Sequence, residues 1–245
     1  MFNLVGKVAL VTGASRGVGA AVSQMLAERG ADIALNFRSK ASRAEEIAAK
    51  IRAIGRRAVL AQADITSESE VSEMMQTVRT YYDRLDLLVL NASGGLEKNK
   101  HPDYAMHLNL TAQERLVDMA VPLMQTGGKV VFVTSHLAHF HRQKPGYDVY
   151  EPVAASKYAG EQALRDRIPN LTDRGITLAV VSGDLIEGTI TPKLMERSTR
   201  GLIDERRQQA GTLPTIEDFA KAIADTCVNS SLSSGATVFV GSTQW

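Results

Sequence analysis

A glycine-rich turn near the start of the chain has the residue types that bind phosphate. The apolar run Val8–Val11 leads into Thr12-Gly13-Ala14-Ser15-Arg16-Gly17-Val18-Gly19, and an apolar-periodic segment then continues to about Gly30. A strand that turns through glycines into a helix brings backbone N–H groups and the positive end of the helix to one point, where a pyrophosphate can bind. Glycine allows the tight turn and lets a ligand approach the backbone closely. Taken alone, the Gly-x-x-x-Gly-x-Gly spacing would also suit a plain strand–helix corner.

The end of the second apolar run carries cations, at the place where a dinucleotide-binding fold meets the adenosine ribose. This segment reads Asn36-Phe37-Arg38-Ser39-Lys40, and Arg16 lies in the glycine turn. A carboxylate here would accept a hydrogen bond from a ribose 2′-hydroxyl and repel a 2′-phosphate, whereas cations favour the phosphorylated cofactor. Asp32 starts this strand rather than ending it. The sequence therefore favours NADP, although Arg38 and Lys40 would also fit as solvated loop charges.

Composition narrows the class of protein. The chain has 245 residues, 44% of them hydrophobic, and a formal net charge of +1, which gives no electrostatic reason to expect nucleic acid as a partner. The longest apolar runs are too short for a membrane span, and the segment Met1–Lys7 lacks the pattern of a secretion signal. A single cysteine, Cys227, excludes an internal disulfide and a cysteine metal cluster, and its apolar helical context predicts burial. We expect a cytoplasmic protein without a metal.

Short β-rich runs alternate with longer helical patterns along the chain. We predict strands at 8–11, 32–37, 58–62, 85–90, 129–134, 177–181 and 237–240, and helices near 18–29, 41–54, 68–82, 103–124, 153–168 and 216–228. Ser67 with Glu70, and Thr215 with Asp218, are typical of capping boxes. Strict alternation implies an α/β fold in one domain spanning 1–245: a doubly wound Rossmann fold whose seven-stranded parallel sheet is flanked by helices. Ligands of such sheets bind at the carboxyl ends of the strands.

Small and polar residues follow the third and fourth predicted strands, where a ligand is expected. Asp64-Ile65 follows the third strand, and Asn91-Ala92-Ser93-Gly94-Gly95 follows the fourth. Small side chains beside a cofactor permit close approach of the backbone, and either segment alone would also suit an ordinary turn. Asn109 lies inside a helical pattern, where asparagine is an indifferent helix former, so it faces either solvent or a polar contact in the site.

Together these residues resemble the short-chain dehydrogenase/reductase family over essentially the whole chain. The resemblance rests on the TGxxxGxG turn at 12–19, Asp64, the Asn-Ala-x-Gly loop at 91–94 and Asn109. In such enzymes a serine ends the fifth strand, and a Tyr-x-x-x-Lys motif opens the next helix. Ser135 and Lys157 match the serine and the lysine, but Val153 stands where the tyrosine belongs.

Tyr150 is the nearest replacement, in the spacing Tyr-x6-Lys with Lys157. This spacing is similar to that of the divergent enoyl-acyl-carrier-protein reductase branch of the family. Seven residues return to the same helix face about two turns away, roughly 10 Å along the axis. Pro152 suits the first helical turn, which places Tyr150 just ahead of the helix. The alternative is that Tyr150 is a loop aromatic and another group, such as Tyr147, is the acid.

The resemblance also implies roles for the site residues. Tyr150 would donate a proton, Ser135 would hold the substrate oxygen, Lys157 would bind the cofactor ribose, and Asn109 would support a water path for proton return. Because a tyrosine with a pKa near 10 is a weak acid, we expect the Lys157 ammonium and the charge of oxidised nicotinamide to lower it. The expected cofactor contacts are Gly13, Ser15, Arg16, Gly17, Val18, Gly19, Arg38, Ser39, Asp64, Ile65, Asn91, Ala92, Ser93, Lys157, Gly183 and Thr189.

Two further segments would shape a substrate pocket. Three histidines in His136-Leu137-Ala138-His139-Phe140-His141 lack the accompanying ligands of a zinc site, so a substrate-lining loop or simple surface histidines are expected. The charged segment from about 187 to 212 suits a lid that closes over substrate.

The resulting hypothesis is an NADPH-dependent oxidoreductase that transfers a hydride to an α,β-unsaturated or keto substrate, such as an acyl thioester. A ketoreductase or alcohol dehydrogenase with a displaced tyrosine is the alternative within enzymes, and a catalytically silent NADP-binding sensor or scaffold is the alternative outside them. The family resemblance also implies a homodimer or homotetramer, formed through the helices at 103–124 and 153–168 and the last strand. The tail Val238-Phe239-Val240, ending in Trp245, would pack either there or on its own core.

Overall fold

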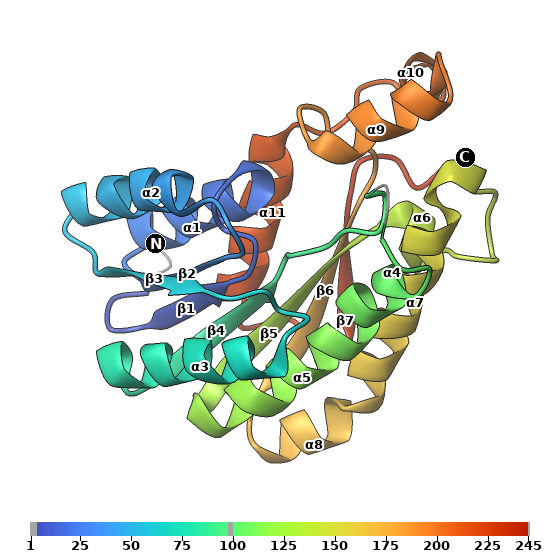
Figure 1. Ribbon diagram of the computed structural model, residues 1–245. Helices are drawn as coiled ribbons and strands as arrows, with labels where there is room; N and C mark the ends of the chain where they lie inside the picture. The colour runs from blue at the N-terminus through green and yellow to red at the C-terminus, as the bar shows by residue number, and fades with distance from the viewer. Residues whose placement is uncertain (1–3, 98–99, 245) are drawn as a thin grey trace.

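The seven strands in the described part of the chain all lie in one parallel sheet (Figure 1). The structure is a computed structural model that describes residues 4–97 and 100–244. The strands are β1 (Val8–Val11), β2 (Asp32–Phe37), β3 (Ala58–Gln62), β4 (Leu85–Leu90), β5 (Met124–Ser135), β6 (Thr177–Gly183) and β7 (Ala236–Val240). Their order is β3-β2-β1-β4-β5-β6-β7, which confirms the predicted seven-stranded Rossmann sheet.

The sheet reverses its winding between β1 and β4. The chain builds β1, β2 and β3 outward in one direction, and then crosses back to place β4 on the other side of β1. The crevice at the carboxyl ends of these two strands is therefore the topological switch point, where ligands of open α/β sheets bind. Strands β1, β2 and β4 are buried along their whole length, as the inner strands of a parallel sheet covered on both faces should be.

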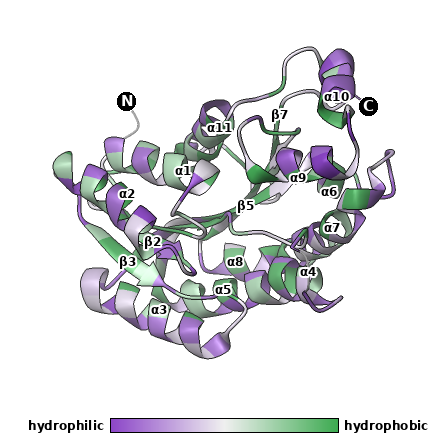
Figure 2. Ribbon diagram, turned by 45° about the horizontal axis from the view of Figure 1, so that its top comes forward, coloured by the Kyte–Doolittle hydropathy of each residue, from purple (hydrophilic) through white to green (hydrophobic). Residues whose placement is uncertain are grey.

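Helices cover both faces of the sheet. One face packs against α1 (Gly17–Glu28), α2 (Ala41–Ala53) and α11 (Ile216–Val228), and the other against α3 (Glu68–Tyr82), α5 (Ala112–Ala120) and α7 (Glu151–Asp166). Figure 2 shows the hydrophobic residues gathered along the strands, while the helices α2 and α3 carry hydrophilic residues as well. Cys227 is buried in α11 as expected, and burial raises the pKa of its thiol to about 12.

The predicted helix at 103–124 is not one helix. It divides into α4 (Tyr104–Met106), the π-helical turn η1 (His107–Thr111), α5 and the 3-10 turn η2 (Val121–Leu123), and β5 begins at Met124 instead of 129. The helix predicted at 153–168 is α7, which begins at Glu151, and α8 (Ile168–Asp173) follows it. Pro152 lies in the first turn of α7, and Tyr150 is its N-cap residue, as predicted.

The two predicted capping boxes differ in the structure. Thr215 and Asp218 form the complete reciprocal box at the start of α11. At the start of α3 the Ser67 side chain accepts from the Glu70 backbone N–H, but the Glu70 carboxylate accepts from the backbone N–H of Asp64 instead. The predicted box at Ser67 and Glu70 is therefore only half formed, because the loop before α3 supplies a different N–H donor to the Glu70 carboxylate.

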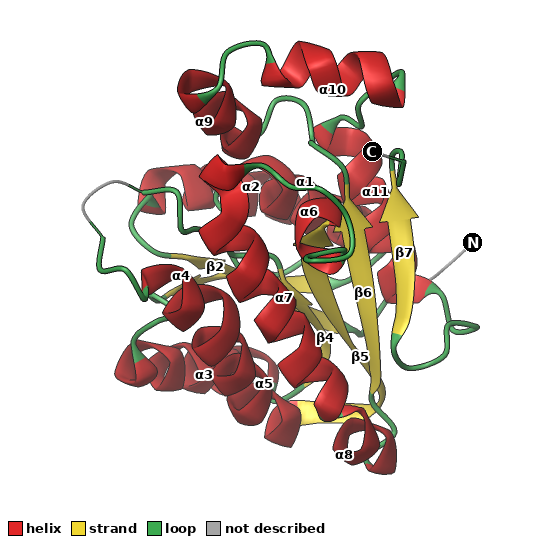
Figure 3. Cartoon of the chain, turned by 90° about the vertical axis from the view of Figure 1, so that its right-hand side faces the viewer, coloured by secondary structure: helices red, strands yellow, loops and turns green. Residues whose placement is uncertain are grey.

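The segment predicted as a lid folds into two helices above the carboxyl ends of the strands (Figure 3). These are α9 (Ile190–Ser198) and α10 (Leu202–Ala210). Arg206 of α10 is fully buried in an ion pair with Asp184, which directly follows β6 (2.8 Å), and it also donates to the carbonyls of Ser242 and Gln244. These contacts fix α10 to the end of the sheet.

Residues 1–3 of the N-terminal segment and Trp245, whose packing the sequence left open, lie outside the described residues. Within the described part, none of the helices has the length and apolar character needed to span a bilayer.

Candidate active site

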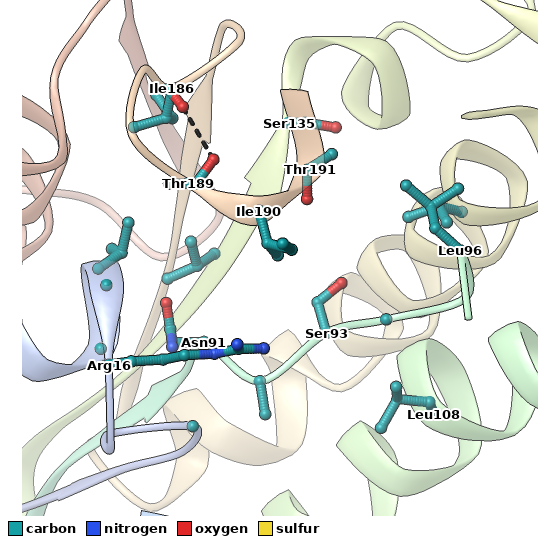
Figure 4. A pocket seen from close by; sticks show the side chains of 18 of the residues that line it. Arg16, Asn91, Ser93, Leu96, Leu108, Ser135, Ile186, Thr189, Ile190 and Thr191 are labelled. Atoms are coloured by element: carbon teal, nitrogen blue, oxygen red, sulfur yellow. Dashed lines mark hydrogen bonds between the residues drawn. The ribbon is translucent and has the colours of Figure 1, made fainter. Parts of the chain in front are cut away.

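A cavity of about 780 Å³ opens at the switch point, between the glycine turn after β1 and the loop after β4 (Figure 4). All sixteen predicted cofactor contacts line it, from Gly13 to Thr189, and so do Ser135 and Tyr150. Asn109 is the predicted site residue that does not line it. Such a volume lies within the range of ligand pockets, which typically enclose roughly 300–1,000 Å³.

The glycine turn has a shape that only glycine permits at two positions. Gly17 begins α1 with a φ of +55°, a region that other residues rarely adopt. A Cβ at Gly19 would lie 2.5 Å from the Gly13 carbonyl oxygen and 2.6 Å from Asn91 Nδ2. The backbone can therefore lie directly against a bound pyrophosphate, which is the fit expected for a dinucleotide.

Two polar side chains hold the turn against neighbouring strands. Asn36, at the end of β2, accepts a hydrogen bond from the Gly13 backbone N–H (3.2 Å) and donates to the carbonyls of Ala61 and Ala63. Thr12 accepts from the backbone N–H groups of Asn91 and Ala92, both at 2.9 Å. These bonds fix the two lips of the crevice relative to each other.

The end of β2 carries the cations expected for a 2′-phosphate. Arg38, Ser39 and Lys40 line the cavity there. The Arg38 guanidinium donates to the Tyr104 hydroxyl (3.0 Å) and lies 3.8 Å from the Asp64 carboxylate. Asp32 is buried at the opposite end of β2 beside Arg56 and Arg57, and so cannot serve as a ribose acid.

Ser135 and Tyr150 meet in the wall of the cavity. Ser135 Oγ lies 3.2 Å from the Tyr150 hydroxyl, and either oxygen can be the donor. Ser135 ends β5, and its Oγ also accepts from the Ala138 backbone N–H, which fixes its position. Tyr150 is buried within the chain, at the wall of the same cavity. Tyr147, the alternative acid, lines a different, smaller cavity.

Lys157 lies on α7 in the cavity wall, and its side chain is buried although its ammonium group is charged. Burial lowers the pKa of Lys157 to about 8, and the charge of Glu161 one turn further along α7 partly opposes this. Burial likewise raises the pKa of Tyr150, and the hydrogen bond with Ser135 partly opposes that shift. Burial therefore dominates the pKa of Tyr150 in this structure, and the lowering expected from the Lys157 ammonium is not seen. The part of that expectation that rests on oxidised nicotinamide stays a prediction.

Asn109 acts behind the cavity, in the π-helical turn η1. Its side-chain amide donates to the Gly94 carbonyl (2.9 Å) and to Ser156 Oγ (3.0 Å). A Cβ at Gly160 of α7 would lie 2.0 Å from the Asn109 carbonyl oxygen, so the two backbones touch there. Asn109 is 1% exposed, and its Oδ1 has no partner among the described residues. Of the two expectations for this residue, the polar contact is correct.

His136 and His141 are buried and His139 is half-buried, so the alternative of simple surface histidines was wrong. None of the three lines the main cavity, but Leu137 of the same segment does, in line with the other alternative of a substrate-lining loop. His136 is fully buried against Ser182 (2.8 Å), and burial lowers its pKa to about 4. His139 and His141 bind Glu161 and Glu151, both at 2.8 Å. The rings of His136 and His139, on the short helix α6 (His136–His139), pack against Phe239 of β7, and the ring of His141 packs against Tyr158 of α7. Within the described residues, no group of three His, Cys, Asp or Glu side chains could hold a metal ion.

Helix α9 closes the cavity from above, whereas α10 does not line it. In Figure 4, Ile190 and Thr191 face the cavity, opposite Ser93. Thr189 donates to the Ile186 carbonyl (2.8 Å), which closes the turn before α9. Leu194 of α9 lines the cavity, as the leucines of the predicted lid could. The sequence did not indicate the lining residues on α11, because Ile216 and Phe219 look like ordinary helical apolar positions.

The family model for short chain dehydrogenases matches residues 7–198, most of the chain. This chain belongs to the short-chain dehydrogenase family. It is accordingly an oxidoreductase, and the glycine turn, Ser135 and Lys157 all lie within the matched segment.

Individual relatives support the assignment. The chain is 36% identical over 187 residues to a hydroxynaphthalene reductase, arp2, of Aspergillus fumigatus, a match that covers 73% of this chain and 66% of that reductase, just under two thirds of its length. It is 32% identical over 244 residues to a cyclohexanol dehydrogenase of Rhodococcus sp. strain TK6, covering 90% and 88% of the two chains. A short chain dehydrogenase from Burkholderia cenocepacia, solved with NADP, superposes with a TM-score of 0.83 at 30% identity over 97% of both chains.

This short-chain dehydrogenase departs from the family pattern at Val153, and the structure shows what fills the space. Val153 is 3% exposed and lines the cavity. A Cβ at Gly95 would lie 3.0 Å from Val153 Cγ2 and 2.8 Å from the Ala105 Cβ. The loop after β4 therefore packs closely against Val153 and Ala105, with no room for a side chain at Gly95.

Proposed function

We propose that this short-chain dehydrogenase is an NADPH-dependent carbonyl reductase in which Tyr150 is the proton donor. The observation that carries the proposal is the 3.2 Å approach of the Ser135 and Tyr150 hydroxyls, inside the cavity that the glycine turn also lines. Two hydroxyls at this separation can both donate to one substrate oxygen, which is where negative charge develops during reduction of a ketone.

The residues present fit NADP. The close backbone approach at Gly19 suits the pyrophosphate, and Arg16, Arg38 and Lys40 supply cations for phosphate groups. Figure 4 shows the Arg16 side chain extending from the glycine turn along the cavity. When bound, the reduced cofactor supplies the hydride.

The side chains of the site then supply the proton and stabilise the negative charge that develops on the substrate oxygen. Ser135 and Tyr150 bind the carbonyl oxygen, and Tyr150 gives its hydroxyl proton to that oxygen as the alcohol forms. The ammonium of Lys157 places positive charge in the same cavity and is available to bind the cofactor ribose. Asn109 holds the Gly94 loop against Ser156 and so keeps the wall near the reacting groups in place.

The substrate half of the cavity favours an apolar ketone. Its walls carry Leu96, Leu137, Val153, Leu185 and Leu194. Burial of apolar surface against such walls favours hydrocarbon substrates by roughly 25 cal/mol for each Å². The names of the two curated relatives, a hydroxynaphthalene reductase and a cyclohexanol dehydrogenase, also suggest a cyclic ketone or alcohol.

A second candidate function is reduction of an enoyl thioester, and the Tyr-x6-Lys spacing of Tyr150 and Lys157 favours it. In that reaction the hydride goes to a carbon two bonds beyond the carbonyl carbon, while the same oxygen collects the charge. Both reactions need a donor at the oxygen, so the tyrosine alone does not distinguish them.

Side-by-side assays separate the two reactions. Cyclohexanone, an acetoacetyl thioester and a crotonyl thioester are each supplied with NADPH and with NADH, and oxidation of the cofactor is followed by absorbance. The proposal expects NADPH oxidation with a ketone and little with the crotonyl thioester. Turnover of the crotonyl thioester alone would support enoyl reduction, and tight NADPH binding without turnover of any carbonyl or enoyl substrate would support a silent binding protein.

A homodimer or homotetramer is part of the same proposal. Strand β7 is an edge of the sheet, and its Phe239 side chain is 43% exposed, so a second copy would cover apolar surface there. Sedimentation of the purified protein would give a species of two or four chains. A single chain across the micromolar range would count against an oligomer.

A further inference from the structure

A second cavity of about 170 Å³ lies behind Tyr150. The residues that line it are Leu137, His141, Arg142, Lys144, Gly146, Tyr147, Tyr150, Glu151 and Ala154. Two of them, Leu137 and Tyr150, also line the main cavity. The proposed proton donor therefore stands between the substrate site and a separate space.

This second cavity is polar and large enough to hold water. One water molecule occupies about 30 Å³ of liquid, so there is room for several. Its outer residues Arg142, Gly146 and Glu151 are exposed, whereas His141, Tyr150 and Ala154 are buried. The cavity thus leads from the buried tyrosine to the protein surface.

His141 is the titratable group at the buried end. Its ring is 8% exposed, and its Nε2 lies 2.8 Å from the Glu151 carboxylate, whose side chain is 58% exposed. Its Nδ1 is buried without a hydrogen-bond partner among the described residues. A buried ring nitrogen of this kind needs water or another polar partner, since an unsatisfied buried polar atom costs about 1–3 kcal/mol.

We infer that this cavity returns protons to Tyr150 from solvent, through water, His141 and Glu151. The inference rests on the proposed function, in which Tyr150 loses one proton to the substrate oxygen in each turnover. The phenolate then takes a proton from cavity water, the water is reprotonated by the His141 imidazole, and His141 regains its proton through Glu151 and bulk water. One proton enters from solvent for each proton given to substrate, and no redox change is involved.

The surroundings of His141 are suited to this relay. On α7 it faces Glu151 and the ring of Tyr158, whose centroid is 5.6 Å away. Arg142 and Lys144 share the cavity wall from its own loop, and the Lys144 ammonium is bonded to the Thr243 carbonyl. Lys157, by contrast, does not line this cavity. The route is therefore distinct from the one through Lys157 and Asn109.

His141→Gln and Glu151→Gln test the relay, with His139→Gln as a matched control. His139 also binds a glutamate at 2.8 Å, Glu161, but it lines neither cavity. The readout is kcat for NADPH-dependent ketone reduction between pH 6 and pH 9, with and without added imidazole. Because external acid becomes scarcer as the pH rises, the loss in kcat should grow toward pH 9.

We expect His141→Gln to lower kcat about tenfold at high pH and imidazole to restore most of it, since general acid–base groups contribute at least this much. His139→Gln should keep kcat within about twofold of wild type. Restoration by a small acid distinguishes a relay from a structural role, which imidazole would not repair. If His141→Gln fails to fold, Glu151→Gln gives the same test, because Glu151 is an exposed residue at the outer end of the second cavity.

An unchanged kcat in both variants across the pH range would overturn the relay, as would a loss that imidazole does not restore. Tyr150→Phe distinguishes failure of the relay from failure of the proposed function. If that variant is inactive while His141→Gln equals wild type, the relay fails and the proposed function stands. If Tyr150→Phe retains full activity, the proposed function itself fails.

Discussion

Replacing Lys157 with methionine should stabilise the protein while removing its activity. Lys157 is buried with its charge, and its pKa falls from the ordinary 10.5 to about 8. At roughly 1.4 kcal/mol for each pH unit, this corresponds to a cost of about 3 kcal/mol for folding with the lysine protonated. Methionine has a similar stem and no charge, so the Lys157→Met variant avoids that cost.

The pH dependence of this gain has a defined direction. Between pH 8 and pH 10.5 the unfolded chain keeps the lysine proton and the folded chain has lost it, so wild-type stability rises with pH in this window. The cost is fully present below about pH 8. We expect the stability gap between Lys157→Met and wild type to be about 3 kcal/mol at pH 7 and to shrink as the pH approaches 10.5.

Guanidinium unfolding of both proteins at pH 7 and pH 9.5, at one protein concentration and without cofactor, measures the gap. Lys129→Met is the matched control: burial lowers the pKa of Lys129 too, but its ammonium donates to the carbonyls of Thr226 (2.9 Å) and Asn229 (2.5 Å), which methionine would leave without that donor. No hydrogen bond to another described residue offsets the burial of Lys157. Lys129→Met should therefore destabilise, by about 1–3 kcal/mol. This reasoning would be refuted if Lys157→Met were no more stable than wild type at pH 7, or if the difference in free energy of unfolding were the same at pH 7 and pH 9.5.

Three further perturbations address the cofactor site and the helix α10. Gly19→Ala places a Cβ 2.5 Å from the Gly13 carbonyl oxygen, so the affinity for NADPH in a fluorescence titration should fall at least about tenfold; an unchanged affinity would contradict the close fit. Arg38→Ala should lower the preference for NADPH over NADH, measured as a ratio of kcat/KM values, by about tenfold, and an unaltered ratio would mean that other cations read the phosphate. Arg206→Met leaves the Asp184 carboxylate buried and unpaired, and should cost about 3–5 kcal/mol in denaturant unfolding, with the pair Arg206→Met and Asp184→Leu recovering much of it. Equal stability of Arg206→Met and wild type would show that this ion pair does not fix α10.

The strands and the glycine turn were predictable because the sequence patterns that indicate them are local. Each strand is a short apolar run beside a turn, and the strand ranges 8–11, 32–37, 58–62 and 85–90 are the same in the structure. The glycine turn lies next to such a strand. Every residue predicted to contact the cofactor, from this turn and from later segments, lines one cavity. Even the position of Tyr150 ahead of α7 followed from Pro152.

Features that depend on contacts between distant segments were not predictable. The π-helical turn at Asn109 lies where its carbonyl approaches Gly160, which is far away in the sequence. The histidines at 136–141 look polar and exposed, but His136 and His139 pack against Phe239 of the last strand, and His141 packs against Tyr158 of α7. The burial that raises the pKa of Tyr150 likewise belongs to the folded chain and not to the Tyr-x6-Lys spacing.

The most direct test of the central claim is the turnover of Tyr150→Phe. Phenylalanine keeps the buried ring and removes the hydroxyl that lies 3.2 Å from Ser135 Oγ. With a ketone that wild type reduces, we predict a kcat lower by roughly 10²–10⁴-fold and an NADPH dissociation constant within about twofold of wild type. A variant that reduces the ketone as fast as wild type would contradict the assignment of Tyr150 as the proton donor.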